Sequence, residues 1–374
     1  MARSIGAREV DFLIAELSGR SLVRLGPSSG SDGASGGLGA ATRVPLRGTP
    51  HGRALARQAV EVVAEGGTML VLAPVTNRGH AIGLLELRLP ALPDNRVIDE
   101  IAVAAHALSY VLIVNSRYTD LFEWGQRSAP LSLAAEIQHR LLPNASTLEA
   151  EQFTLASWLE PAGEVAGDSY DFSLDPDRLH LSITDAMGHS LEAALLATLL
   201  VGALRNARRA GCSLEEQAQR GHAALVRFSR DDQFVTGQLV RVDLGEGLAE
   251  IVNAGHPPPL RVRDGQIERL RLANDAPFGA VAETAYRPQP VTLRTGDRLV
   301  FLTDGMLERN AADLDVDAAV RASAGLHPRE AVQHLTEAVL DASGGVLQDD
   351  AAVLCLDWHG GPPRQREARQ GADR

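Results

Sequence analysis

The sequence predicts an α+β protein built from two domains. Strand-like segments with alternating apolar residues recur along the chain beside stretches with helical spacing. The balance changes near Glu149: before it, a few strands are followed by long helices, and after it many strands alternate with acidic turns and two long helices, 190–209 and 328–342. With 374 residues, the chain is long enough to bury two sizeable cores.

The first part of the chain is expected to contain a few strands and three helices. In order, we expect two short strands between Val10 and about Leu25, a flexible Gly- and Ser-rich loop over 26–39, a helix over 53–64, a strand pair over 68–75 and 81–87 joined by the turn residues 76–79, a long helix from about Asn95 that Pro130 interrupts, and a second helix that Pro143 stops.

The second part of the chain carries aspartates at the ends of apolar strands. They are Asp185 after the alternating strand 179–184, Asp304 after the apolar run 299–303, and Asp349 and Asp350 before the apolar run 351–356. Taken singly, each is more typical of an ordinary capping carboxylate. Three such sites far apart in sequence indicate carboxylates that converge on hard metal ions, which prefer oxygen ligands. The pattern therefore favours an enzyme.

Composition narrows the classes of partner. The net charge of −12 disfavours nucleic acid, because binding to nucleic acid depends on neutralising phosphates. The basic cluster Arg205, Arg208 and Arg209 is interpreted as the solvated end of a helix rather than a docking patch. We find no signal-peptide core and expect no apolar run long enough to span a bilayer, so a soluble cytoplasmic protein is predicted. Two cysteines do not make a disulfide framework or a zinc site.

Six short motifs follow one another between Glu149 and Trp358. They are Ala166-Gly-Asp168-Ser-Tyr-Asp171-Phe, Asp185-Ala186-Met-Gly-His189-Ser190, Asn253-Ala-Gly-His256-Pro-Pro, Ala276-Pro-Phe-Gly279, Thr303-Asp304-Gly with Glu308 after it, and Asp349-Asp350. Together and in this order they resemble the stage II sporulation protein E-type branch of the protein phosphatase 2C-like (PPM) serine/threonine phosphatases. The helix 132–142, ending in Leu-Leu-Pro143, also resembles the helix that precedes the domain in this family.

Three positions depart from the family pattern. Ala166 and Ser190 stand where glycines are usual, and Ala352 stands where a threonine is usual. None of these changes removes a carboxylate. Ser190 alters the turn beside the expected metals, so it bears on the level of activity rather than on its presence.

The resemblance implies a fold and a metal centre. The fold is an αββα sandwich of two antiparallel sheets with two Mn²⁺ or Mg²⁺ ions at one end. Asp185 would bridge both ions with help from the Ala186 carbonyl. The remaining ligands would be Asp168, Asp304 and Asp349, with Asp350 a weaker candidate.

Three further residues of the motifs have open roles. His189 is either a proton donor to the leaving seryl oxygen or a turn residue, with neither favoured. His256 is interpreted as a turn residue that bonds backbone. Asp171 is either a ligand or a residue that supports the turn.

Residues 1–118 resemble a small sensor domain of the GAF type. The stretch 46–52, the strand 82–87 and the long closing helix carry this similarity, and a PAS-like sensor is the alternative. The implied organisation is a GAF-like domain over 1–118, a helical linker over 119–148, a phosphatase domain over 149–358 and a disordered tail over 359–374. We expect the linker helices to support a homodimer.

Two functions from different classes are compatible with these features. The first is a phosphoserine phosphatase that the sensor domain regulates, and the resemblance implies a phosphorylated anti-sigma-factor antagonist as its substrate. The second is a degenerate phosphatase that binds a partner without hydrolysing anything. The complete set of aspartates favours the first. A nuclease or another metallohydrolase is disfavoured by the acidic charge.

Overall fold

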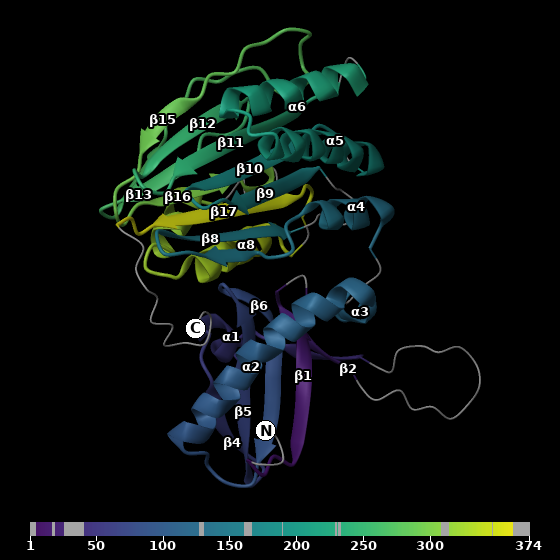
Figure 1. The fold of residues 1–374 in the computed structure, drawn as a ribbon, viewed down its shortest axis with the longest axis vertical. Coiled ribbons are helices and arrows are strands. Elements are labelled where there is room, and N and C mark those ends of the chain that lie inside the picture. The colour runs from purple at the N-terminus through teal and green to yellow at the C-terminus, as the bar shows by residue number, and fades with distance from the viewer. Residues whose placement is uncertain are drawn as a thin grey trace, which may run out of the picture. The chain divides into compact units, whose positions relative to one another are not determined.

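The chain divides into two compact units on either side of residue 130 (Figure 1). The computed structural model describes residues 5–16, 19–25, 41–126, 131–160, 167–188, 190–228, 230, 233–307, 314–345 and 347–361. The loop expected over 26–39 and the tail beyond residue 361 lie outside these residues. Of the segment expected to link the domains, helix α3 (Leu121–Gln126) lies in the first unit and α4 (Leu133–Leu141) in the second.

The first unit is a six-stranded antiparallel sheet with helices. The strands follow the order β3-β2-β1-β6-β5-β4, with bounds β1 Glu9–Ala15, β2 Ser21–Leu25, β3 Ala41–Pro45, β4 Glu61–Glu65, β5 Thr68–Asn77 and β6 His80–Leu89. Helix α1 spans Pro50–Arg57 and α2 spans Asn95–Asn115, followed by the 3₁₀ turn η1 Ser116–Tyr118. The predicted strand pair is confirmed as β5 and β6.

The helix predicted over 53–64 is only partly correct. Helix α1 ends at Arg57 because Gln58 adopts a left-handed backbone, with φ of 53°, and caps the helix. The following residues form strand β4, in which Val62 pairs with Val71 of β5. β-Branched residues favour such a position in a sheet.

The closing helix of the first unit is strongly apolar. Residues Asn95–Tyr118 form the one helix of the described chain that is long and apolar enough to cross a membrane, judged by length and composition alone. The expectation that no apolar segment reaches this length is therefore wrong. Ile101 and Ala105 pack against the sheet, whereas Val103, Val111 and Val114 are exposed. A single helix of this kind is weak evidence for a membrane span, because core helices of soluble proteins pass the same test.

The second unit contains two antiparallel sheets. One has the order β15-β12-β11-β10-β9, with bounds β9 Asp168–Leu174, β10 Arg178–Ala186, β11 Val235–Asp243, β12 Leu248–Ala254 and β15 Gln289–Thr292. The other has the order β14-β13-β16-β17-β8-β7, with bounds β7 Thr147–Glu149, β8 Phe153–Glu160, β13 Leu260–Arg263, β14 Gln266–Arg269, β16 Arg298–Leu302 and β17 Ala351–Trp358.

Besides α4, four helices of the second unit cover the outer faces of these sheets. They are α5 Ser190–Arg209, α6 Leu214–Phe228, α7 Val316–Ala322 and α8 Pro328–Ala342, with the 3₁₀ turn η2 Asp304–Met306. One apolar core lies between the sheets, a second lies under α5 and α6, and a third lies under α7 and α8 (Figure 1). The two predicted long helices are confirmed, and the four layers agree with the expected αββα sandwich.

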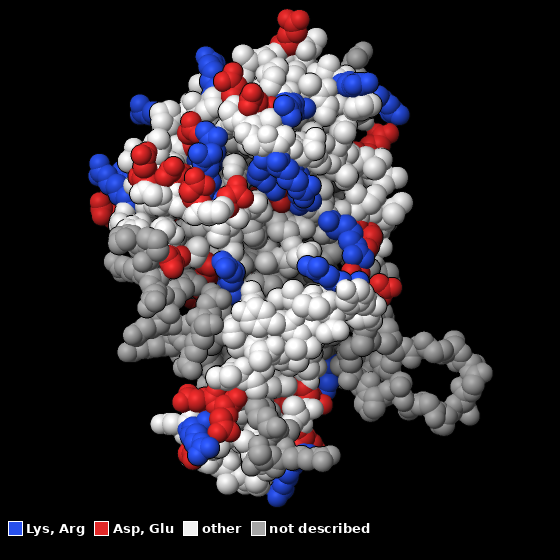
Figure 2. All heavy atoms as spheres, viewed as in Figure 1, with Lys and Arg blue, Asp and Glu red and all other residues white. Residues whose placement is uncertain are grey.

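Helix α6 was not predicted, although its start carries a capping signal. The Ser213 hydroxyl accepts the Glu216 amide, and the Glu216 carboxylate accepts the Ser213 amide. On the surface of this unit, side chains of both charge signs are interspersed over the face drawn in Figure 2.

Candidate metal centre

Two of the predicted aspartates lie side by side at one end of the first sheet. Asp185 at the end of β10 pairs directly with Asp168 at the start of β9. Side chains alternate between the two faces of a strand. Leu181 and Ile183 point into the core between the sheets, and Asp185 continues their series. Asp168 likewise continues the inward series of Tyr170. Both carboxylates therefore lie in the slot between the two sheets.

The second sheet brings two more carboxylates to the same slot. These carboxylates belong to Asp350, which precedes β17, and to Asp304, which follows Thr303 at the end of β16. Asp350 and Thr303 continue the inward-facing series of their strands. The Thr303 hydroxyl donates a 2.6 Å hydrogen bond to Asp168 Oδ2, and it accepts the Ala352 amide at 2.9 Å. Asp304 begins the turn η2 directly after Thr303. Thr303 thus connects the carboxylates of the two sheets.

Asp168 is buried among other carboxylates of the slot. Burial raises the pKa of Asp168 well above its usual range, and the charges of Asp185, Asp350 and Asp304 raise it further, against the lowering effect of the Thr303 hydrogen bond. Like-charged carboxylates in a buried slot disfavour one another's ionisation unless a cation is present. Carboxylate oxygens are the donors that Mg²⁺ and Mn²⁺ prefer, so the residues fit hard divalent cations.

The slot is not a preformed cage. Among the described residues, the carboxylates do not close into a set of three or more ready-made metal ligands. Small cations of this class keep several water ligands and need few side chains. The geometry supports a site for such ions without defining their number.

Gly167 fits closely against the other side of the slot. Its amide donates to Asp350 Oδ2 at 3.1 Å, and its carbonyl accepts the Ala186 amide at 3.1 Å. A Cβ at this position would lie 2.7 Å from the Ala186 carbonyl oxygen, which the sequence singled out as a metal ligand. A side chain here would therefore displace that oxygen.

Sequence reasoning missed one residue of this site, Gln138 of α4. Its side chain is buried, and Nε2 donates to Asp350 Oδ2 at 2.6 Å and to the Asp168 carbonyl oxygen at 2.8 Å. Its place on the buried face of α4, beside Ala134, Ala135 and Leu141, was the available signal. A glutamine among apolar positions needs a buried partner.

The remaining predicted residues are placed as follows. Asp349 lies next to Asp350, and its Oδ1 accepts the Asp350 amide at 3.0 Å. His189, together with Ala166 and Glu308, lies outside the described residues. The backbone of Ser190 begins helix α5.

Asp171 faces away from the slot. It is buried and accepts hydrogen bonds from Arg205 at 2.8 Å and Arg208 at 3.0 Å, both on α5. Its carboxylate therefore fixes the helix to the sheet. The interpretation of Arg205 and Arg208 as a solvated helix end is wrong, because both side chains turn toward this buried charge.

His256 is held in a buried turn at the end of β12. Its ring Nδ1 shares a 2.9 Å hydrogen bond with the Thr236 hydroxyl, and its amide donates to Asn253 Oδ1 at 3.1 Å. Burial lowers the pKa of His256 to about 3, so the ring is neutral at physiological pH. These contacts agree with a turn residue.

We expect His256 to make the second unit sensitive to acid. Below about pH 6.5 the unfolded chain takes up a proton at this residue and the folded chain does not, so stability falls as pH falls from that value toward 3. Between pH 7 and pH 5 the loss from this residue is about 2 kcal/mol. Urea unfolding of wild type and His256→Asn at both pH values measures it. Equal losses of stability in the two proteins would contradict the assignment.

The comparisons with known proteins agree with this architecture. Residues 175–359 match the model of the Stage II sporulation protein E (SpoIIE) family. Phosphoserine phosphatase RsbP of Bacillus subtilis is 25% identical over 187 residues, which cover 49% of this chain and 46% of RsbP. Phosphoserine phosphatase RsbU of the same organism is 20% identical over 282 residues, which cover 71% of this chain and 81% of RsbU. The chain thus matches about half the length of RsbP.

Among solved structures, the SiaA-PP2C domain of Pseudomonas aeruginosa superposes with a TM-score of 0.52 at 20% sequence identity, covering 60% of this chain and 93% of that one. The second unit therefore has the fold of PP2C-type domains. The match to the SpoIIE family model lies entirely within this unit, over residues 175–359. The resemblance drawn from the six motifs is confirmed.

Proposed function

We propose that the second unit is a metal-dependent serine/threonine phosphoprotein phosphatase. The observation that carries the proposal is the slot between the sheets, where Asp168 pairs with Asp185 and accepts a hydrogen bond from Thr303 of the other sheet. Burial there, together with the charges of Asp185, Asp350 and Asp304, raises the pKa of Asp168. Similarity to RsbP and RsbU, which are named phosphoserine phosphatases, supports the same activity.

The slot carboxylates, with Asp349 and the Ala186 carbonyl, would hold two Mn²⁺ or Mg²⁺ ions. Such ions, when bound, neutralise phosphoryl charge and make a water molecule a better nucleophile. The residues of the chain then have distinct tasks: Thr303 and Gln138 orient Asp168 and Asp350 through the hydrogen bonds described above. Hydrolysis adds water to phosphorus and breaks the bond to the seryl oxygen, and His189 would protonate that oxygen as it leaves.

The substrate and regulation extend the proposal. We infer that the substrate is a phosphorylated anti-sigma-factor antagonist in a partner-switching system. We further infer that a GAF-like sensor over 1–118 controls activity and that a linker over 119–148 precedes the phosphatase domain 149–358. The inferred location is cytoplasmic. We also infer a homodimer through the linker helices. The exposed apolar residues Val111 and Val114 of α2, which precedes the linker, support it by extending an apolar surface along the chain just before these helices.

The test is hydrolysis of p-nitrophenyl phosphate and of a phosphoserine peptide with and without Mn²⁺. We expect turnover that requires the metal, that stops when EDTA removes it and that returns on adding Mn²⁺ in excess. Metal binding in calorimetry without turnover of either substrate would instead support the alternative, a pseudophosphatase that acts as a partner-binding module.

A further inference from the structure

An arginine-lined groove lies between the outer edges of the two sheets of the second unit. A cavity of about 590 Å³ is bounded by β13, β15 and the segment after β14, and a second of about 930 Å³ continues from it toward Asn253 and His256. Both cavities are lined by Arg261, Leu270, Arg271 and Leu272, so they form one groove.

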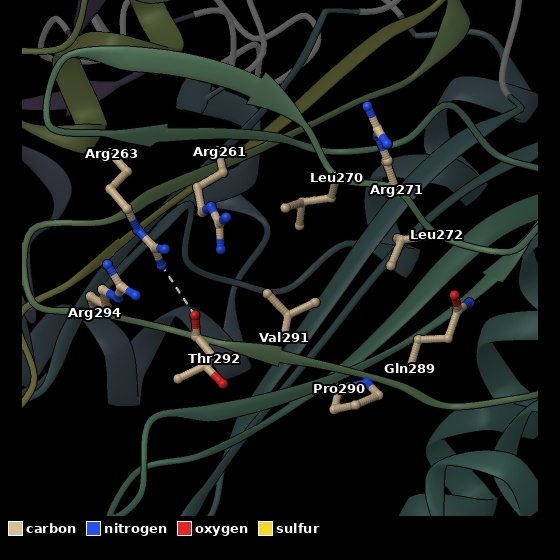
Figure 3. A pocket seen from close by; sticks show the side chains of 10 residues that line it. All are labelled: Arg261, Arg263, Leu270, Arg271, Leu272, Gln289, Pro290, Val291, Thr292 and Arg294. Carbon is tan, nitrogen blue, oxygen red and sulfur yellow. Dashed lines mark hydrogen bonds between the residues drawn. The ribbon is translucent and has the colours of Figure 1, made fainter.

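The groove is positively charged within an acidic protein. Its lining contains five arginines and a single carboxylate: Arg261, Arg263, Arg269, Arg271 and Arg294, with Glu268. Asp297 and Asp317, just outside the lining, pair with Arg263 and Arg269, so the excess positive charge lies on the other arginines. Arg261, Arg263 and Arg294 cluster at one end, and Arg271 lies at the other beyond Leu270 (Figure 3). The chain as a whole carries a net charge of −12.

Several of these arginines have unused donors. Arg271 and Arg294 are exposed, and neither side chain makes a hydrogen bond or ion pair with the described residues. Arg261 pairs with Glu268 through Nη2, but its Nε is buried without a partner. Arg263 uses Nε and Nη2 on Asp297, at 2.7 and 2.6 Å, which fixes its position in the wall of the groove. A buried donor without a partner, such as Arg261 Nε, and the exposed guanidinium groups of Arg271 and Arg294 favour an anionic ligand that supplies acceptors.

The register of the sheet relates this groove to the aspartate slot. Asp185 of β10 pairs with Thr236 of β11. The next residue of β11, Gly237, pairs on its other side with Ala254 of β12. The groove therefore begins about two strand spacings, or about 10 Å, from Asp185. It then follows β15, in which Gln289 pairs with Ile251 of β12 and Thr292 pairs with Leu248. From Asn253 to Leu248 this path is about 17 Å long, enough for about five extended residues.

We propose that this groove binds an acidic segment of the phosphoprotein substrate, in an extended conformation, beside the phosphorylated residue. The inference rests on the proposed phosphatase function for the position of the phosphoserine. With that residue at the slot, about three residues cross to the groove and the next five or so lie in it. Apolar side chains of Leu270, Leu272 and Val291 line the groove between the arginines, so aliphatic residues interspersed with the acidic ones fit best.

The test measures binding directly, by fluorescence anisotropy with the full chain. The probes are labelled phosphoserine peptides with glutamates at the fourth to seventh positions on one side of the phosphoserine or the other, each compared with a glutamine version. We expect one glutamate peptide to bind several-fold more tightly than its glutamine version, with a difference that shrinks at high salt. The double variant Arg271→Ala, Arg294→Ala should lose about five- to tenfold in affinity for that peptide.

A matched control uses an arginine outside the groove. Arg220→Ala removes an exposed arginine of α6 and should leave the preference for glutamate intact. Equal binding of glutamate and glutamine peptides, or the same preference in the double variant, would overturn the proposal. Loss of the preference for glutamate in the presence of low concentrations of inorganic phosphate would also overturn it, because the groove would then be a site for small anions.

The binding readout does not depend on turnover. If the peptides bind through the arginines but are never hydrolysed, the proposed phosphatase function is refuted and the proposed role of the groove is upheld. If they are hydrolysed without any preference for glutamate, the proposed role of the groove is refuted and the phosphatase function is upheld.

Discussion

Replacing Asp185 with asparagine should abolish metal-dependent hydrolysis while leaving the fold intact. Asp185 lies opposite Asp168 at the end of the sandwich, and its charge contributes to the raised pKa of Asp168. The amide keeps the size of the side chain but removes the negative charge that a divalent cation requires. We expect turnover of p-nitrophenyl phosphate to fall by about a thousandfold or more, equivalent to about 4 kcal/mol of transition-state stabilisation.

The same substitution gives an independent readout in the absence of metal. Without a cation, Asp185 repels Asp168, so the asparagine variant should unfold in EDTA at the same urea concentration as wild type or at a higher one. The matched control is Asp177→Asn, an exposed carboxylate just before the other end of β10, which should change neither turnover nor stability. Full activity in Asp185→Asn would refute the proposed metal centre.

The core of this site could be predicted from the sequence because a strand has a period of two. The alternation that buries Leu181 and Ile183 between the sheets also fixes the direction of Asp185 at the strand end. The same rule explains why Asp171 does not join the site, since it lies on the opposite face of β9 from Asp168. Its partners on α5 could not be predicted, because which helix covers a sheet is a tertiary property.

Other features depend on contacts between segments far apart in sequence. Helical spacing could not distinguish β4 from a continuation of α1, since pairing with β5 decided the outcome. Between Asp349 and Asp350, the sequence favoured the first as a ligand, whereas the described contacts place Asp350 against Gly167 and Gln138. The arginine-lined groove arises only where β15, the edge strand of one sheet, lies near β13 and the segment after β14 of the other sheet.

Gln138 is the second residue whose replacement should have a large effect. Its amide connects α4 with both sheets by donating to Asp350 and to the backbone of Asp168. Leucine has a similar volume but no donor. Gln138→Leu should therefore remove the hydrogen bond from Gln138 Nε2 to Asp350 Oδ2 and leave the one from the Gly167 amide. Residues that orient metal ligands typically contribute 10- to 100-fold to metal affinity or activity, and we expect a loss of about that size.

A positioning role predicts a particular pattern of kinetics. In Gln138→Leu the concentration of Mn²⁺ needed for half-maximal turnover should rise, and a large excess of Mn²⁺ should restore part of the lost kcat. A general loss of stability would instead lower activity equally at every Mn²⁺ concentration. Arg140→Gln, an exposed substitution on the same helix, is the control and should leave the Mn²⁺ dependence unchanged.

The result would also bear on regulation. Helix α4 follows the helices of the first unit in sequence, and Gln138 connects it directly to Asp350. A small displacement of α4 would break this hydrogen bond and release the carboxylate, so the position of the helix and the affinity for metal would be coupled. If Gln138→Leu binds and uses Mn²⁺ as wild type does, α4 has no such influence, and control by the first unit would have to act elsewhere on the second.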